Sequence, residues 1–134
     1  MRRIATILFT IPMAVFGFLH FGPLDFSLDY VPSWLPFPAF WVYFAGLGLL
    51  AFAISVALGK LDRLAGYLLA VELLLFVMLI HVPKAGSGDF VGLIAVFRDT
   101  AMAGGALLFA EGFARDRFLP FANNTTSVHL NETV

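Results

Sequence analysis

Four long apolar stretches restrict most strongly what this chain can fold into. They cover residues 4–21, 39–58, 64–81 and 90–114, and a helix needs roughly 20 mostly apolar residues to cross a bilayer. None of them alternates apolar and polar residues with a period of two, as a half-buried strand would. Backbone groups inside lipid must bond within their own segment, so the pattern predicts an all-α, integral membrane four-helix bundle.

Composition supports a membrane protein. The chain has 134 residues, of which 60% are hydrophobic and 13% charged, whereas a soluble domain is about 45–50% apolar and about 25% charged. Nine acidic and eight basic residues cannot coat a soluble core of this size. The net charge of -1 argues against a nucleic-acid partner, which would call for a clustered basic face. The lack of cysteine excludes disulfides and thiolate metal sites.

Turn-forming and charged residues separate the apolar stretches. Phe21-Gly22-Pro23 ends the first stretch, and three prolines interrupt the long connection that follows. A charged turn at 59–63 joins the second and third stretches, and the segment 83–89 is expected to close the third. The chain therefore reads as one domain, 1–117, followed by a polar tail, 118–134, that we expect to be a disordered cytoplasmic segment.

The basic residues predict the orientation. Cytoplasmic loops carry an excess of Lys and Arg, and six of the eight basic residues fall on one side of the predicted spans: Arg2, Arg3, Lys60, Arg63, Arg115 and Arg117. Both termini are therefore expected in the cytoplasm, in an N-in/C-in, multi-pass topology. The first stretch lacks a small-x-small cleavage site, so it is expected to remain as a helix rather than to be removed as a signal peptide.

Three ionisable residues lie inside the predicted spans. Glu72 is about 13 Å from the outer end of the third helix and Arg98 about 12 Å from that of the fourth, at 1.5 Å per residue. Neighbouring antiparallel helices would bring these two charges to one level, with Asp99 beside them, in a buried polar cluster. Two interpretations stay open: an ion pair that fastens the helices, or a polar site for a ligand or a proton. Asp99 adds a second carboxylate, which needs another donor, a proton or water.

Two histidines end the first and third helices at the predicted outer face. His20 and His81 should share a level, because both helices run outward. Each could be a simple hydrogen-bonding residue, or could carry a proton or bind a quinone carbonyl. Two histidines with distant carboxylates do not make a metal set, so no metal site is predicted.

Small residues and one charge pair have mainly structural interpretations. Glu111 and Arg115 stand four residues apart, with the acid first, and are expected to form an interfacial ion pair. Small residues allow close helix contact in lipid. Five of them are expected to pack the second and fourth helices: Gly46, Gly48, Ala101, Gly104 and Gly105.

Several blocks of the sequence are similar to one known family. They are Gly-Phe-Leu-His-Phe at 17–21, Val-Pro-Ser-Trp-Leu-Pro-Phe-Pro at 31–38, Val-Tyr-Phe-Ala-Gly at 42–46 and Arg-Asp-Thr-Ala-Met-Ala-Gly-Gly-Ala-Leu-Leu at 98–108. Over most of 1–114 the chain resembles the DoxX-like family of small bacterial membrane proteins. The resemblance implies a location in the bacterial cytoplasmic (inner) membrane.

The chain departs from the family pattern at one position. Many relatives carry a glutamate shortly after the Val-Tyr-x-x-Gly entry to the second helix. Here that neighbourhood reads Leu47-Gly48-Leu49-Leu50, and the membrane carboxylate is Glu72 of the third helix. A site built on the usual glutamate cannot be carried over.

The resemblance also implies a redox context. The family name comes from a membrane subunit of a thiosulfate:quinone oxidoreductase, so an accessory subunit of a membrane redox complex that interacts with quinone is expected, without thiosulfate chemistry. His20 and His81 would donate hydrogen bonds to a quinone, and Asp99 or Glu72 would carry its proton. No catalytic residue and no intrinsic cofactor are assigned, so the electrons would come from a redox partner protein.

Two further functions stay open. One is a non-catalytic membrane scaffold or assembly partner, and the other, ranked lower, is a small-solute permease. The low rank follows from the absence of a repeated half or a broken helix pair in the sequence. Besides the lipid bilayer, a redox protein or a second copy of the chain is the expected partner.

Overall fold

The computed structural model describes residues 1–23, 28–116 and 118–120, and within these residues it contains helices and no strand. Four helical segments are long and apolar enough to cross a membrane, which confirms the predicted all-α architecture. The first two and the last are single helices: α1 (Arg2–Leu19), α3 (Pro38–Leu58) and α6 (Phe90–Gly112). The third span is made of α4 (Asp62–Phe76), the π-helical turn η1 (Val77–His81) and α5 (Val82–Gly86). Most of the predicted tail, residues 121–134, lies outside the described residues.

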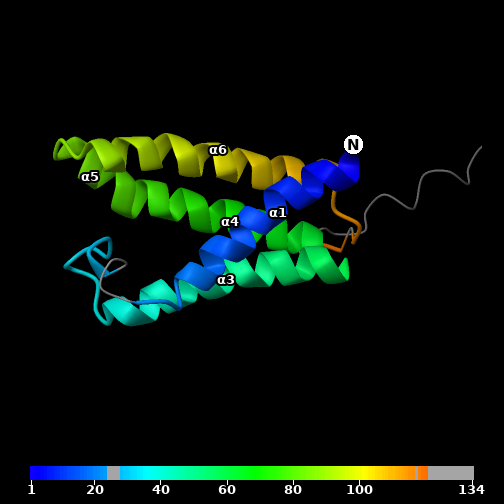
Figure 1. The fold of residues 1–134 in the computed structure, drawn as a ribbon, viewed down its shortest axis with the longest axis horizontal. Helices are drawn as coiled ribbons and strands as arrows, with labels where there is room; N and C mark the ends of the chain where they lie inside the picture. The colour runs from blue at the N-terminus through cyan, green and yellow to red at the C-terminus, as the bar shows by residue number, and fades with distance from the viewer. Residues whose placement is uncertain (24–27, 117, 121–134) are drawn as a thin grey trace, which may run out of the picture.

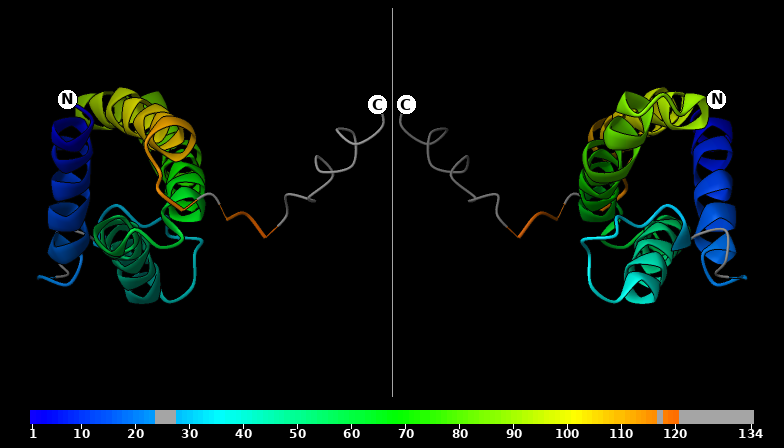
Figure 2. Two further views of the ribbon diagram at one scale, coloured as in Figure 1. Left: turned by 90° about the vertical axis from the view of Figure 1, so that its right-hand side faces the viewer. Right: turned by 90° about the vertical axis from the view of Figure 1, so that its left-hand side faces the viewer.

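The four spans form a ring in the order α1, α3, α4 and α6 (Figure 2). Helix α4 packs against both α3 and α6, whereas α1 packs mainly on α3. Helix α1 crosses the bundle diagonally, from the end of α6 toward the start of α3 (Figure 1). Its Arg2 side chain donates a hydrogen bond to the carbonyl of Gly112, so both ends of the four-helix unit meet at one end of the bundle. We call this the terminal end, and the opposite end the loop end.

The third span continues beyond the end expected from sequence. It was expected to stop at 81, before the segment that contains Pro83, but it continues to Gly86. In η1 the Val82 N–H bonds to the carbonyl of Val77, five residues back, so the helix widens by one residue. Pro83 then falls in the first turn of α5, directly after the widened turn. The turn widening therefore lets the chain keep a helical course through a proline.

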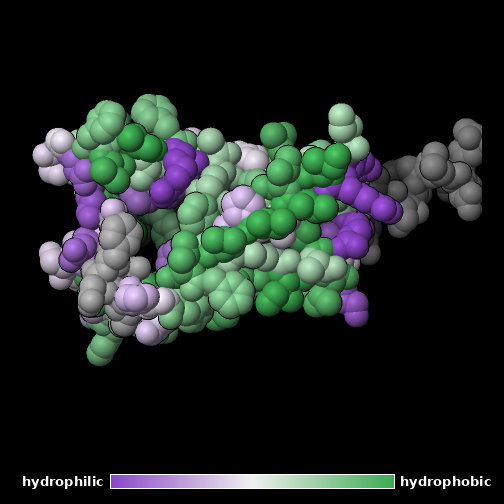
Figure 3. All heavy atoms as spheres, viewed as in Figure 1, coloured by the Kyte–Doolittle hydropathy of each residue, from purple (hydrophilic) through white to green (hydrophobic). Residues whose placement is uncertain are grey.

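The core lies between the four spans in the terminal half of the bundle. Phe52 of α3 is 1% exposed, and its ring packs edge-on against Phe9 of α1 and Phe109 of α6, with centroids 5.7 and 5.4 Å away. Buried Leu69 and Leu73 of α4 complete this cluster. Large apolar side chains cover the outside of the spans. On the face seen in Figure 3, hydrophilic residues gather toward the two ends. This surface suits a lipid environment.

Glycines set the contact between α1 and α3. A Cβ added to Gly46 would lie 2.6 Å from the Cβ of His20 and 3.0 Å from the carbonyl oxygen of Gly17. The two backbones therefore approach so closely that neither position has room for a side chain, as expected for small residues at a helix contact in lipid.

The small residues of α6 divide into different roles. Gly105 receives the ring of Phe9, since an added Cβ would lie 2.8 Å from that ring. Gly104 faces open space and Ala101 is exposed, so neither packs α6 into the bundle as expected. The contact with α4 is made by buried alanines instead, because Gly66 of α4 meets Ala110.

Candidate functional site

A buried histidine and a buried aspartate meet between η1 and α6. Nε2 of His81 lies 2.9 Å from Oδ2 of Asp99, and the two residues are 7% and 2% exposed. Asp99 was singled out from the sequence together with Arg98 and Glu72, and the structure adds His81 to it as a direct partner. The carboxylate accepts from Nε2–H, which leaves Nδ1 of a neutral imidazole as a lone-pair acceptor.

Arg98 binds the other carboxylate oxygen. Its Nε lies 2.6 Å from Oδ1 of Asp99, and its side chain is half exposed. Arg98 stands seven residues, or about two helical turns, before Gly105, which contacts Phe9 of α1. It therefore occupies the face of α6 that looks toward α1. Because α1 leans away toward α3 at the loop end (Figure 1), this guanidinium is at the edge of the bundle rather than in its core.

Four buried polar atoms have no hydrogen-bond partner among the described residues: Nδ1 of His81, Oε1 of Glu72, Oγ1 of Thr10 and Nε of Arg63. The Glu72 carboxylate rests against Gly48 of α3, since a Cβ on that glycine would overlap both of its oxygens. Buried polar atoms in folded proteins are nearly always paired, so each unpaired atom calls for an explanation.

The expected meeting of Glu72 with Arg98 is replaced by a different arrangement. No ion pair joins these two residues in the described part of the chain, and Arg98 bonds to its neighbour Asp99. The physical reason is the register of the third span against α6. The third span runs five residues past His81 before the chain turns, which moves Glu72 about 7–8 Å toward the terminal end relative to α6. The second donor that Asp99 was expected to need is His81.

His20 has a local partner. Its Nδ1 lies 2.7 Å from the carbonyl of Phe16, one turn back in α1, and its Cβ lies on Gly46 of α3. His81 instead contacts α6 through Asp99. The two histidines thus belong to different helix pairs, and nothing in the described residues links them. No three His, Asp or Glu side chains of the described residues converge on a point where a metal ion could be held.

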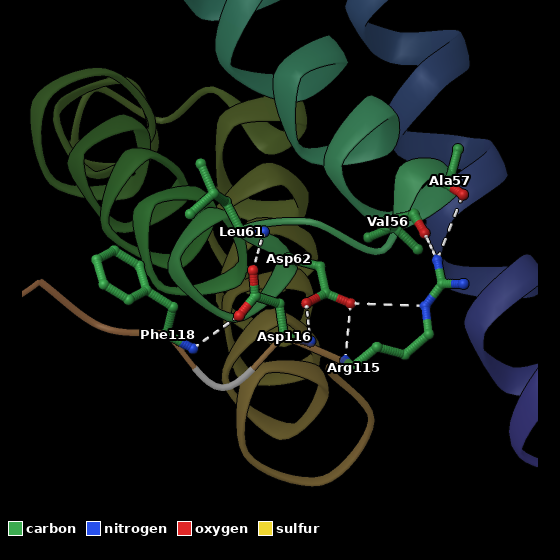
Figure 4. A network of polar contacts seen from close by, with 7 residues as sticks. All are labelled: Val56, Ala57, Leu61, Asp62, Arg115, Asp116 and Phe118. Atoms are coloured by element: carbon green, nitrogen blue, oxygen red, sulfur yellow. Dashed lines mark hydrogen bonds and ion pairs between the residues drawn. The ribbon is translucent and has the colours of Figure 1, made fainter.

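A second polar cluster lies at the terminal end, and the sequence analysis missed it. Asp62, which opens α4, is 1% exposed and accepts from the backbone N–H groups of Arg115 and Asp116, at 2.8 and 2.9 Å (Figure 4). Nε of Arg115 lies 3.9 Å from the same carboxylate. The sequence signal for Asp62 was its position in the first turn of a helix, because acidic residues are favoured there.

The Arg115 side chain joins this cluster to the end of α3. Its guanidinium donates to the carbonyls of Val56 and Ala57 in the last turn of α3 (Figure 4). It also lies over Gly59, the residue that ends this helix. The expected Glu111–Arg115 pair is therefore wrong. Glu111 accepts instead from Arg63, at 3.2 Å, and from the Tyr67 hydroxyl. Glu111 and Arg115 therefore bind partners on other helices rather than each other.

Asp116 completes the terminal cluster. Its carboxylate accepts from the backbone N–H groups of Leu61 and Phe118, each at 2.9 Å, and these two hydrogen bonds lower the pKa of Asp116. Leu61 has a left-handed backbone conformation with φ 54°, which is unfavourable for a residue with a side chain. The hydrogen bond to Asp116 helps to hold the turn between α3 and α4 in this conformation.

Comparison with protein-family models, with curated proteins and with solved structures finds no match to this chain. Two polar clusters remain as the features of the described residues that bear on function. The terminal cluster has satisfied its carboxylates and serves to fix the chain after α6. The His81–Asp99 pair retains one unpaired nitrogen, Nδ1 of His81, beside a buried carboxylate, so it is the candidate functional site.

Proposed function

We propose that this chain is a membrane subunit that binds a quinone headgroup at the His81–Asp99 pair, within a larger redox complex. One observation carries the proposal: the buried imidazole is oriented by Asp99 through Nε2, while its Nδ1 is buried without a partner. The resemblance to the DoxX-like family supports the same context.

The pair can exchange a proton with the ligand. The hydroxyl of a quinol would donate its proton to Nδ1 of His81, and the Asp99 carboxylate would stabilise the imidazolium that forms. Two-electron oxidation releases two protons. The unpaired Oε1 of Glu72 lies nine residues from His81, or about 13 Å along the helix, so the second proton would reach it through intervening water. The two electrons pass to a partner protein that carries a redox cofactor. In the reverse direction, the imidazolium donates Nδ1–H to the quinone carbonyl.

The outer surface of the spans suits an apolar ligand that arrives from the lipid. Aromatic side chains are exposed on the spans in the loop-end half, including Phe44 of α3 and Phe97 of α6. An apolar surface with a few convergent polar groups is the usual character of a small-molecule site. With both termini in the cytoplasm, as the basic residues predict, the pair would lie in the outer half of the membrane.

A binding titration tests the proposal. The full chain is reconstituted in lipid nanodiscs and titrated with the reduced, quinol form of a short-tailed ubiquinone analogue, with quenching of tryptophan fluorescence as the readout. We expect His81→Ala to weaken binding about tenfold, since it removes the acceptor for the quinol hydroxyl. The matched control is His20→Ala, whose Nδ1 is already bonded within α1. Equal effects of the two substitutions, or no binding by the wild-type chain, would refute the proposal.

A scaffold without chemistry is the second candidate, and one observation favours it. Both oxygens of Asp99 are bonded, one of them to His81, so the carboxylate fastens η1 to α6. If this is the only role, His81→Ala should lower the unfolding temperature in detergent without changing quinone affinity. A small-solute permease gains no support from the described residues.

A further inference from the structure

The terminal end holds a cavity with a basic lining. It has a volume of about 750 Å³ and lies between α1, α3 and the end of α6. Three arginines line it, Arg2, Arg3 and Arg115, against one carboxylate, Asp62. The Asp62 oxygens are already occupied by two backbone N–H groups. The charge on the wall is therefore positive and fits an anion.

The three arginines differ in how many hydrogen bonds they already make. Arg2 donates to the carbonyl of Gly112 and lies 5.4 Å from the ring centroid of Phe113, and Arg115 donates to carbonyls of α3. Arg3 makes no hydrogen bond or ion pair with any described residue and is exposed. A carbonyl partner leaves an arginine its charge and most of its five donors. Arg3 thus offers all of its donors to a ligand in the cavity, and Arg2 and Arg115 offer the donors that their carbonyl partners leave free.

A second, apolar cavity continues from the first toward the middle of the span. It has a volume of about 190 Å³ and shares Thr6, Phe109 and Phe113 with the basic cavity. Its other walls are Ala5 and Phe9 of α1 with Gly105 and Leu108 of α6. Phe9 is six residues beyond Arg3, or about 9 Å deeper along the helix. The basic cavity is at the level of lipid headgroups, at the ends of the spans, and the apolar one is at the level of acyl chains.

We propose that these two cavities form a binding site for an anionic phospholipid. The phosphate lies among Arg2, Arg3 and Arg115, and the start of one acyl chain lies between α1 and α6 against Phe9 and Leu108. Basic pockets between transmembrane helices recognise anionic headgroups in this way. Helix α1 packs mainly on α3, so the lipid fills the side on which α1 and α6 share few contacts.

Native mass spectrometry of the full chain in mild detergent tests the site. The protein is offered phosphatidylglycerol, or phosphatidylcholine with the same acyl chains, or soluble glycerol phosphate. We expect one phosphatidylglycerol to be retained, in preference to phosphatidylcholine, and glycerol phosphate not to displace it. Arg3→Gln should lower this preference about fivefold, since one arginine near an anionic headgroup contributes this much. Ala5→Leu, which fills the apolar cavity, should lower retention of the lipid.

The matched control is Lys60→Gln, which removes one exposed positive charge at the same end but outside the cavity. It should leave the preference unchanged. Equal retention of the two lipids, or equal effects of Arg3→Gln and Lys60→Gln, would overturn the proposal, because the arginines would then act only through general charge. Displacement by glycerol phosphate at the affinity of the lipid would also overturn it, because the site would then bind a free phosphate.

Discussion

Nε2 of His81 and Oδ2 of Asp99 lie 2.9 Å apart, and this contact joins the only π-helical turn of the described residues to α6. The extra residue of η1 sets the direction of the imidazole, since a π-turn rotates the residues that follow it. Such turns occur frequently at functional sites. The pair is therefore a product of both the helix irregularity and the register of α6.

The ion-pair pattern predicts which substitutions are coupled. Arg98→Met and Asp99→Asn should show a coupling energy of about 0.5–3 kcal/mol, because their side chains are bonded. Arg98→Met and Glu72→Gln should add within about 0.5 kcal/mol, because no contact joins them. The measurement is unfolding in detergent of the single and double variants. A coupling between Glu72 and Arg98 as large as that between Arg98 and Asp99 would contradict the structure.

Two glycines of the spans should respond in opposite directions to the same substitution. Gly46→Ala should destabilise the protein by about 1–3 kcal/mol, because the new methyl group would overlap His20 and force α1 away from α3. Gly104→Ala should stabilise it by about 0.5–1 kcal/mol, because that position faces open space and alanine favours a helix. Unfolding temperatures in detergent check both. Equal shifts would mean that α1 does not approach α3 at Gly46.

The terminal cluster should be important for stability. Asp62→Ala leaves two backbone N–H groups without their acceptor, at a cost of about 1–3 kcal/mol each in a buried site. Glu111→Ala is the control at the same end of the bundle. It removes a more exposed carboxylate, paired with Arg63, and should cost about 1 kcal/mol or less. A smaller loss for Asp62→Ala than for Glu111→Ala would show that the turn does not depend on this contact.

The lowered pKa of Asp116 predicts a loss of stability in acid. The folded-state pKa lies below the unfolded value, about 3.9 for an aspartate. The ionised carboxylate therefore contributes stability above that value, and the contribution disappears as the pH falls through the folded-state pKa. Asp116→Asn should be less stable than the wild type at neutral pH, and the difference should shrink in acid. A difference that stays constant from neutral pH to pH about 3 would contradict this assignment.

The orientation in the membrane can be tested by cysteine labelling, since the chain has no cysteine. Ser33 lies at the loop end and Lys60 at the terminal end, and both are exposed. With both termini in the cytoplasm, a Ser33→Cys variant should react with an impermeant reagent in intact cells. A Lys60→Cys variant should react only after permeabilisation. The reverse pattern would invert the topology predicted from the basic residues.

The sequence by itself determined the helices and the membrane environment. The apolar stretches and the low charge leave few alternatives, because a segment in lipid must bond its own backbone groups. Asp99 and Glu72 were recognised as unusual for the same reason, since an ionisable residue inside a span is expensive wherever it lies.

Only the tertiary structure decided which of these residues meet. The partners of Asp99, Glu72 and Arg115 depend on helix register, and that register depends on a turn widening before Pro83 that has no clear sequence signature. Five extra helical residues moved Glu72 away from Arg98 and brought His81 to Asp99. Side-chain contacts reach only a few ångströms, whereas each residue of register moves a helix by about 1.5 Å. A small uncertainty in helix ends therefore leaves the spans unchanged but exchanges the partners inside the bundle.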